Sequence, residues 1–392
     1  MIYKFSDICI EKGFIRGPFG SALKKELFVK KGKDTYKVYE QCVPLEQDKT
    51  KGYYYISGEY FRSTLKRFEV RNNDFLVSCS GVNYGAIYHL EEPFEQGVIN
   101  QALLIIRINP KIVDYNYFNY LFSIILKKAI VAGTGDSTIP NFPPIDIIKK
   151  IEIEIPNLDE QKKIGRILKS IDAQIQRNNN MVQKLQVLSH AIFNQFFANE
   201  TVLVSLVDFP YIEILKPGIL PFVGTKHYIA TAEVEGEKLN FDAPLIEYAT
   251  RENRANMQPI PNSVWFAKMK RSIKHIYVTS KDAHLIDNYI FSTGFCGIKC
   301  DDIAFEYVIN YLNLPYFEKE KDILSHGATM EGVNNEDLKS FKIYLPSREV
   351  LLQFHSKTKD IHCYIAKINE ITHQLILLKN KLLPLLINGQ LQ

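Results

Sequence analysis

The stretch IEIEIPNLDEQKKIGRILKSIDAQIQRN, residues 151–178, contains the two features that decide the fold. Alternating isoleucines end at Pro156, which predicts a short strand, and an apolar repeat of helical spacing follows it. Asn157 and Asp159 are N-cap candidates, because a side-chain oxygen there can accept a free amide of the first helical turn. Acidic Glu160 suits the positive end of the helix dipole. We therefore expect a strand, a sharp boundary and then a helix.

The apolar repeat after Pro156 has the spacing of a coiled coil, because its members are separated alternately by four and three residues. At 1.5 Å per residue, a helix of roughly 40 residues spans about 60 Å, which is too long for the interior of one small domain. We expect such a rod to pack against another helix. The seam comprises Ile164, Leu168, Ile171, Ile175, Asn178, Val182, Leu185, Ser189, Ile192 and Phe196.

A second strand and helix follow the same plan after an offset of 190 residues. FKIYLPSREVLLQF, residues 341–354, again places a strand before a proline, and Ser347 is the matching N-cap candidate. We expect the two helices to form an antiparallel pair, in which polar Asn178, Ser189 and Lys379 specify the register. The second seam comprises Phe354, Thr358, Ile361, Ile365, Ile368, Thr372, Leu375, Lys379, Leu382 and Leu386.

The alternative for the helices is that each one packs only on its own domain, and their length argues against it. An apolar face is left over beyond the mutual seam. Its members on the first helix are Ile167, Met181, Leu188 and Phe193. We expect this face to dock partner subunits.

The 190-residue offset also relates the regions before the helices, which indicates an internal duplication. It aligns VRNNDFLVS (residues 70–78) with IPNSVWFAK (residues 260–268), so that Phe75 meets Trp265, and it pairs Tyr117 with Tyr307. Chance similarity of amphipathic patterns is the alternative, but the shared order of elements favours duplication.

Each half combines short strands with a helix, which predicts an α+β fold. The expected strands are FLVSC, QALLIIRI and KIEIEIP in the first half, with VWFA, HIYVTS and FKIYLP in the second. Residues 114–129 and 302–313 have helical periodicity. We expect two similar globular domains, residues 1–156 and 199–346, joined by two long antiparallel coiled-coil helices, residues 157–198 and 347–392, with pseudo-twofold symmetry from the duplication.

Composition limits the class of protein. The 392 residues are 46% hydrophobic and 23% charged, as in folded globular chains, and the length calls for two or more domains. Six scattered cysteines and the absence of an N-terminal apolar run favour a reduced cytoplasm. No stretch approaches the roughly 18 consecutive apolar residues of a membrane helix, so we expect no membrane association.

No motif of an enzyme active site is convincing. AGTGD, residues 132–136, resembles a cofactor-binding turn, but two glycines without a strand directly before them are a weak signal. NFPP (residues 141–144) and DFPY (residues 208–211) do not have the order of an amino-methylating motif, and the phosphate-binding G-x-x-x-x-G-K-[ST] pattern is missing. Cys296 and Cys300 lack a second ligand pair, so we expect no metal, no cofactor and no catalytic residue in this chain.

Two groups of cations are candidates for contact with nucleic acid. Residues 4–71 contain 15 Lys and Arg against 9 Asp and Glu, and no acidic residue lies between 255 and 281. A solvated charged surface is the alternative for both groups. The first basic cluster is Lys24, Lys25, Arg62, Lys66 and Arg67, and the glycine loop beside it (residues 78–85) offers Ser78, Ser80, Asn83 and Tyr84. The second basic cluster is Lys268, Lys270, Arg271 and Lys274.

These features together resemble the specificity subunit of a type I restriction-modification system. The resemblance is carried by RGPFGSALK (16–24), NNDFLVSCSGVNYGAI (72–87), GVINQALLIIRIN (97–109) and GTGDSTIPNFPPIDIIKKIEIEIPNLDEQKKI (133–164). The Ile-x-Ile-Pro strand followed by Glu-Gln and a long helix is the most specific part, and it recurs in degraded form at residues 341–354. The resemblance covers essentially the whole chain.

The resemblance implies a reader of double-stranded DNA that does no chemistry itself. Each globular domain would be a target recognition domain for one half of a bipartite, asymmetric site, and the helices would set the spacer and dock two methyltransferase subunits. Restriction and translocase subunits would complete the complex, and S-adenosylmethionine, ATP and Mg would bind in these partners. Two alternatives stay open: a coiled-coil scaffold that does not bind DNA, and the recognition subunit of a related stand-alone methyltransferase or nuclease system.

Overall fold

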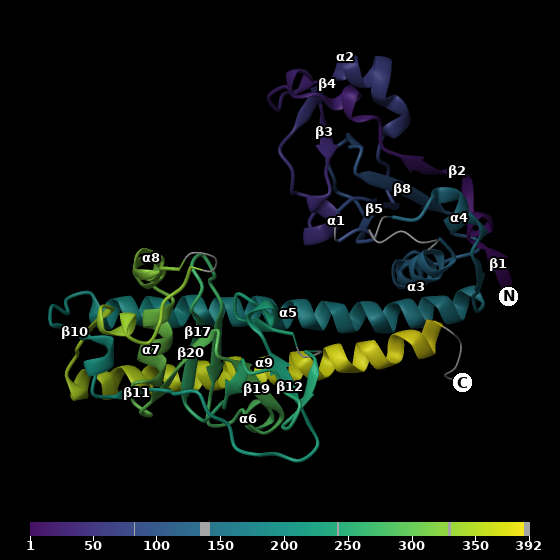
Figure 1. The fold of residues 1–392 in the computed structure, drawn as a ribbon. Coiled ribbons are helices and arrows are strands. Elements are labelled where there is room, and N and C mark those ends of the chain that lie inside the picture. The colour runs from purple at the N-terminus through teal and green to yellow at the C-terminus, as the bar shows by residue number, and fades with distance from the viewer. Residues whose placement is uncertain (82, 134–141, 241–242, 328–330, 388–392) are drawn as a thin grey trace. The chain divides into compact units, whose positions relative to one another are not determined.

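The computed structural model describes residues 1–81, 83–133, 142–240, 243–327 and 331–387 (Figure 1). The chain forms two compact units: unit 1 contains Met1–Ala173 and Ile376–Gln392, and unit 2 contains Gln174–Leu375. This division cuts both long helices, whereas the sequence-based ranges end at them. Most of AGTGD and the segment that follows it lie outside the described residues.

Unit 1 is built around a four-stranded antiparallel sheet in the order β2-β8-β5-β6. Its strand β8 has the sequence LLIIRI, and such a continuous apolar run suits a strand that is covered on both faces. A second sheet has the order β4-β3-β7, and β1 pairs with β9. The strands are β1 (Ile2–Lys4), β2 (Cys9–Arg16), β3 (Thr35–Tyr39), β4 (Tyr55–Ser57), β5 (Asp74–Ser78), β6 (Ile87–Leu90), β7 (Gly97–Ile99), β8 (Leu103–Ile108) and β9 (Glu152–Glu154).

Alternation along β5 divides unit 1 into two cores. Phe75 and Val77 face a cluster with Phe118 and Phe122 of the long helix α3, whereas Leu76 faces the cluster beneath the second sheet. The helices of this unit outside the long pair are α1 (Cys42–Glu46), α2 (Gly58–Tyr60), α3 (Tyr115–Gly133) and α4 (Ile145–Lys150).

Unit 2 repeats this topology, with one additional strand, β16, at the edge of its second sheet. Its sheets have the orders β11-β20-β17-β18 and β15-β12-β19-β16, and β10 pairs with β21 as β1 pairs with β9. The same order of pairing in both units confirms the duplication. The elements are β10 (Leu203–Ser205), β11 (Ile212–Ile214), β12 (Thr225–Ile229), β13 (Val234–Glu235), β14 (Lys238–Leu239), β15 (Leu245–Glu247), β16 (Ala255–Met257), β17 (Ser263–Ala267), β18 (His275–Val278), α6 (Ala283–Asn288), β19 (Tyr289–Ser292), β20 (Phe295–Cys300), α7 (Phe305–Leu312), α8 (Pro315–Leu324) and β21 (Lys342–Tyr344).

The predicted equivalence of Phe75 and Trp265 is wrong by one residue. β5 begins at Asp74 and β17 at Ser263, so Trp265 corresponds to Leu76. A slip of one residue moves a strand side chain to the opposite face, and Trp265 indeed lies in the core on the far side of the sheet from α7. Gly297 makes room for it, because a Cβ there would lie within 2.4 Å of the Trp265 ring.

The two long helices are α5 (Leu158–Phe197) and α9 (Arg348–Ile387), each of 40 residues. The Asn157 carboxamide oxygen accepts the Glu160 amide at 3.0 Å, and the Ser347 hydroxyl accepts the Val350 amide at 3.3 Å, so both predicted caps are confirmed. Gln161 explains the Glu-Gln motif. Its buried side chain accepts the Asp114 amide and donates to two carbonyls, which fixes the start of α5 to the loop before α3.

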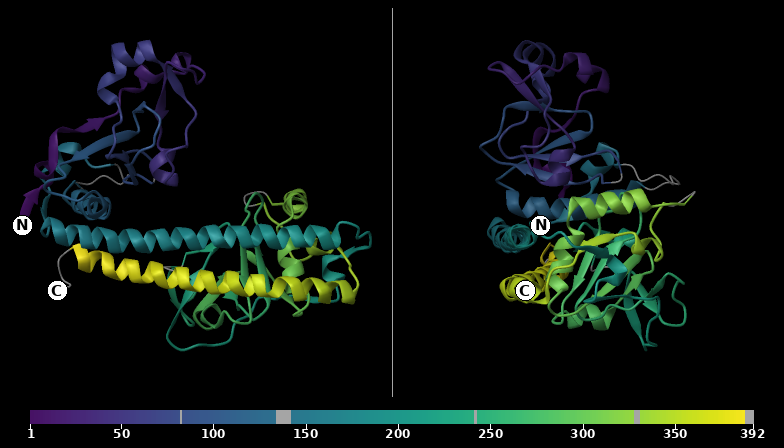
Figure 2. Two further views of the ribbon diagram at one scale, coloured as in Figure 1. Left: turned by 180° about the vertical axis from the view of Figure 1, so that it is seen from behind. Right: turned by 90° about the vertical axis from the view of Figure 1, so that its left-hand side faces the viewer.

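Within unit 2, α5 and α9 lie side by side and run antiparallel (Figure 2). The Asn178 side chain donates to the Thr372 hydroxyl at 3.0 Å, and Ser189 contacts His362 at 2.9 Å, so that the partner number falls along α9 as it rises along α5. Within the ranges that the structure describes, no helix is both long and apolar enough to cross a membrane.

Candidate nucleic-acid interface and helix pair

The second basic cluster lies on the loop that joins β17 to β18. The last residue pair of the two strands before this loop is Phe266 with His275, and two residues of α8 form hydrogen bonds to the loop. Asp322 accepts the Arg271 amide at 2.8 Å, and the Lys321 ammonium donates to the Ser272 carbonyl at 2.8 Å. These contacts fix the loop backbone and leave the Arg271 side chain exposed.

The four cations of this cluster are not equally available to a ligand. Lys270 forms an ion pair with Glu331 at 2.7 Å, and Lys274 donates to the Thr231 carbonyl at 2.6 Å. Lys268 is half-buried. Arg271 makes no ion pair with any residue that the structure describes, so it is the strongest phosphate-binding candidate of the cluster.

In the first basic cluster, too, some cations contact other side chains of the protein and others do not. Arg62 binds Asp34 through two hydrogen bonds of 2.9 Å, and Lys66 lies 3.3 Å from Glu69. Arg67 stacks on Phe68 with its guanidinium 4.9 Å from the ring centre. The structure places Lys24 and Lys25 on the surface without an ion pair in the described ranges. Among the described residues, Lys24 and Lys25 are therefore the cations of this cluster for which neither an ion pair nor a ring contact is seen.

The glycine loop contains one prediction that the structure contradicts. Ser78 is fully buried at the end of β5, where its hydroxyl accepts the Gln41 amide at 2.7 Å, so it cannot reach a ligand on the surface. Ser80 and Asn83 are exposed, and Tyr84 is half-buried. Val82 lies outside the described residues.

The predicted seam residues of both long helices are buried or half-buried, and none is exposed. The three polar residues that were expected to specify the register all make contacts between the helices. Asn178 bonds to Thr372 and Ser189 to His362 in unit 2, and Lys379 forms an ion pair with Asp172 at 2.6 Å in unit 1. Polar groups at such positions favour the one register in which every group is satisfied.

Apolar side chains beyond the seam stand exposed on both helices. Ile167, Met181 and Leu188 of α5 are 46%, 50% and 49% exposed. Phe193 was expected on the same face, but this prediction is wrong. It is only 5% exposed, because it packs against Phe197 and the Tyr307 ring of α7.

The matching face of α9 was not predicted. Tyr364, Ile371 and Leu378 follow one another at intervals of seven residues and are 66%, 40% and 45% exposed. Adding 190 to Met181 and Leu188 gives Ile371 and Leu378, so the same heptad position is apolar and exposed on both helices. The 190-residue offset between the two seams is a signal in the sequence from which this face of α9 could have been predicted.

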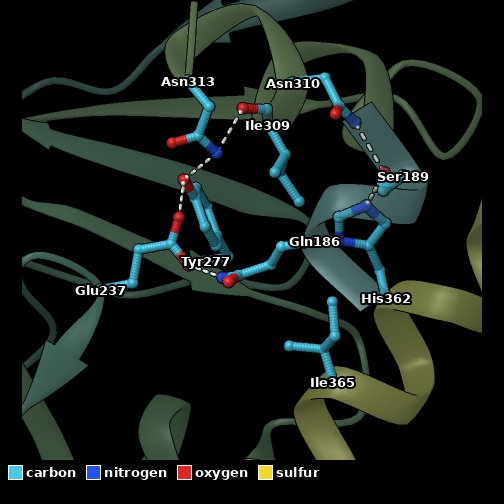
Figure 3. A pocket seen from close by; sticks show the side chains of 9 residues that line it. All are labelled: Gln186, Ser189, Glu237, Tyr277, Ile309, Asn310, Asn313, His362 and Ile365. Atoms are coloured by element: carbon cyan, nitrogen blue, oxygen red, sulfur yellow. Dashed lines mark hydrogen bonds between the residues drawn. The ribbon is translucent and has the colours of Figure 1, made fainter. Parts of the chain in front are cut away.

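A half-buried polar cluster of unit 2 also escaped prediction (Figure 3). Glu237 accepts a hydrogen bond from the Tyr277 hydroxyl at 3.0 Å and another from the Gln186 amide of α5, and Asn313 donates to the Tyr277 oxygen at 2.8 Å. Burial raises the pKa of Glu237 and that of Tyr277. The cavity beside them has a volume of about 20 Å³, enough for one water molecule. The cluster therefore joins α5 to the globular part of unit 2. The cavity beside it is too small to hold a substrate.

Cys296 and Cys300 are both buried in β20, where burial raises the pKa of each thiol. Across the described ranges, no group of three or more His, Cys, Asp or Glu side chains is placed to hold a metal ion.

Residues 22–187 match a family described as the type I restriction modification DNA specificity domain. The matched range lies mostly in unit 1 and continues into α5.

Two curated relatives from Methanocaldococcus jannaschii support the same assignment. The type I restriction enzyme MjaVIII specificity subunit is 28% identical over 162 residues, which are 38% of this chain and 36% of the relative. The putative type I restriction enzyme MjaX specificity subunit is 22% identical over 323 residues, 74% of this chain and 71% of the relative. The chain thus matches only about a third of the first relative's length.

The fold also matches a solved structure, the S subunit of a type I restriction-modification system from M. genitalium. The TM-score is 0.56 at 13% identity, and the match covers 99% of this chain and 96% of that one. At this identity the likeness establishes the fold. The resemblance inferred from the sequence motifs is confirmed.

Proposed function

We propose that this chain, which resembles type I restriction-modification specificity subunits in sequence and in fold, reads DNA sequence in the cytoplasm for partner subunits. The proposal is carried by one observation: a single chain contains the same sheet order twice. Because the two copies differ in sequence, each would read a different half of a bipartite site, and the whole site would be asymmetric. S-adenosylmethionine, ATP and Mg would bind in the partners, and this chain would contribute no catalytic group.

Contact with the DNA backbone is assigned to the cations that the fold leaves free. Lys24 and Lys25 in unit 1 and Arg271 in unit 2 are exposed without an ion pair in the described part of the chain. Backbone contacts of this kind position a protein on the duplex, while neighbouring polar groups read base edges. Ser80 and Asn83 are the exposed polar groups of the glycine loop that was predicted beside the first basic cluster.

Replacing Lys24, Lys25 and Arg271 by alanine should weaken DNA binding most at low salt. Each lost phosphate contact reduces the slope of log K against log salt by about 0.9, so the triple variant should lose about three units of slope if all three residues contact phosphate. Fluorescence titration of a mixed-sequence duplex over a range of salt concentrations measures this slope.

The control is Lys359→Ala, which removes an exposed cation of α9 outside both clusters and should leave the slope unchanged. An unaltered slope in the triple variant would contradict this interface. Binding by the parent chain that does not depend on salt would favour the scaffold alternative.

Docking of two methyltransferase subunits is supported by the exposed apolar face of each helix. Met181 and Leu188 on α5 and Ile371 and Leu378 on α9 occupy the same heptad position in two successive heptads of the duplicated pattern. Exposed apolar side chains that recur along a helix are typical of an interaction surface. Because the two faces are related by the duplication, they fit two copies of one partner better than two different partners.

A further inference from the structure

Among the described residues, each unit contains a polar contact in which three helices meet, namely a helix of its own globular domain, α5 and α9. In unit 1 this contact, here called node 1, consists of Tyr120 of α3, Asp172 of α5 and Lys379 of α9. The Tyr120 hydroxyl donates to one carboxylate oxygen of Asp172 at 2.7 Å, and the Lys379 ammonium donates to the other at 2.6 Å. The same ammonium lies 5.5 Å from the centre of the Tyr120 ring.

The corresponding contact of unit 2, node 2, consists of Asn310 of α7, Ser189 of α5 and His362 of α9. The Asn310 amide donates to the Ser189 hydroxyl oxygen at 3.0 Å, and that hydroxyl lies 2.9 Å from His362 Nε2. Burial lowers the pKa of His362 to about 4, so the ring is neutral at pH 7, and in the tautomer protonated on Nδ1 its Nε2 accepts a hydrogen bond from the Ser189 hydroxyl. Asn310 also donates to the Glu306 carbonyl at 2.8 Å.

The two nodes occupy equivalent positions of the duplication. Adding 190 to Tyr120 gives Asn310, adding 190 to Asp172 gives His362, and adding 190 to Ser189 gives Lys379. The positions are therefore the same in the two units, but the contacts and the chemistry differ: the domain helix bonds to Asp172 in node 1 and to Ser189, the equivalent of Lys379, in node 2. Node 1 combines an ion pair with a bulky phenol at a partly exposed position, whereas all three residues of node 2 are uncharged and buried.

We propose that the nodes specify which globular domain docks on which section of the helix pair. A tyrosine in place of Asn310 would force a phenol ring into the space between Ser189 and His362, and overpacking of a buried site is destabilising. An asparagine in place of Tyr120 would remove the hydroxyl donor to Asp172 and the ring beside the Lys379 ammonium. Each domain residue thus fits its own pair of helix residues and conflicts with the other pair.

This inference concerns assembly and does not rest on DNA reading, because it would hold equally for a scaffold. It has a consequence for the exchange of recognition domains between chains or between positions. An incoming domain has to bring the residue that matches the helix pair it meets, tyrosine opposite Asp172 and Lys379, or asparagine opposite Ser189 and His362.

The experiment transplants each node in steps within the full chain and follows thermal unfolding. In unit 2 the variants are Asn310→Tyr alone, Ser189→Lys with His362→Asp, and all three together. In unit 1 they are Tyr120→Asn alone, Asp172→His with Lys379→Ser, and all three together. Each partial change leaves a mismatched node and should lower the melting midpoint by about 4 °C or more, whereas each complete transplant should recover at least half of the summed loss.

Recovery of the melting midpoint would show that the three residues of a node depend on one another. If each residue only fitted its own surroundings, the decreases in melting midpoint caused by the partial changes would simply add. Complete transplants whose losses equal the sums of the partial losses within about 2 °C would overturn the proposal. If the unit 2 transplant does not fold, the unit 1 series decides, since its ion pair is partly exposed and a mismatch there is less disruptive: recovery there supports the proposal and additivity refutes it.

Discussion

Deleting one heptad from each long helix, Gln176–Val182 and Asn369–Leu375, should move methylation to sites whose two halves lie about three base pairs closer together. Seven helical residues have a length of about 10.5 Å, and B-DNA rises about 3.4 Å per base pair. The deleted segments include Asn178 and Thr372, which bond to each other across the pair, so both members of that contact are removed together. They also remove Met181 and Ile371 of the exposed apolar faces, whereas Leu188 and Leu378 of the same faces remain. Because a full heptad is lost from each helix, the remaining seam residues keep their positions.

The matched control deletes Gln176–Val182 alone. This change shifts the seam of α5 past that of α9 and should abolish methylation altogether, since Ser189 can then no longer meet His362. Sequencing of methylated bases in cells that carry each variant together with the partner subunits measures both outcomes. A double deletion that leaves the original spacer unchanged would show that the helices do not set it.

Replacing Arg107 by methionine should lower the free energy of unfolding of unit 1 by about 3–5 kcal/mol, because it leaves a buried carboxylate without its counter-ion. Arg107 Nε lies 2.7 Å from one Asp74 oxygen and Nη2 lies 3.0 Å from the other, and the Asp74 side chain is only 2% exposed. Denaturant unfolding of the variant and the parent measures the loss.

The penalty should depend on pH in a defined direction. Burial already raises the pKa of Asp74, against the opposing effect of Arg107, and removal of the cation takes away this opposition. A carboxyl with a raised pKa in the folded state favours folding below that pKa and loses this contribution as the pH rises through it. The loss in Arg107→Met should therefore shrink on acidification.

The control for this prediction removes both charges. Asp74→Asn with Arg107→Met keeps a side-chain acceptor for the Arg71 amide, which Asp74 accepts at 2.8 Å in the parent, and leaves no buried charge. It should cost less than Arg107→Met alone. A double variant that is less stable than the single one would contradict the assignment of the loss to the unpaired carboxylate.

The long helices and their seams could be predicted because their signals are local and repeated. Heptad spacing, the prolines before each helix and the caps at Asn157 and Ser347 all lie within a few residues of the features they specify. The same repetition carried the prediction of two α+β domains, because two weak patterns in the same order support each other.

Strand register and burial could not be predicted in the same way. The offset between β5 and β17 is 189 residues, one fewer than between the long helices, so Leu76 and not Phe75 is the equivalent of Trp265. Sequence identity between the two halves is too low to reveal a shift of one residue. Ser78 follows an apolar strand and could equally have ended on the surface. Only the tertiary contact with Gln41, which is distant in sequence, decides that it is buried.

The candidate interface was predictable as two basic clusters, but the available cations within them were not. Arg62 and Lys270 are bound by Asp34 and Glu331, and neither acidic residue lies next to its partner in the sequence. The nodes were hidden for a different reason. Tyr120 and Asn310 have chemically different side chains, so an alignment based on residue similarity does not pair them. The constant offset of 190 residues does pair them.

The most direct test of the central claim, that each globular domain reads one half of the site, is to replace residues 1–156 with those of a relative while retaining Tyr120. Sequencing of methylated adenines should then show one new half-site, with the other half and the spacer unchanged. Alteration of both halves, or of neither, would contradict the claim.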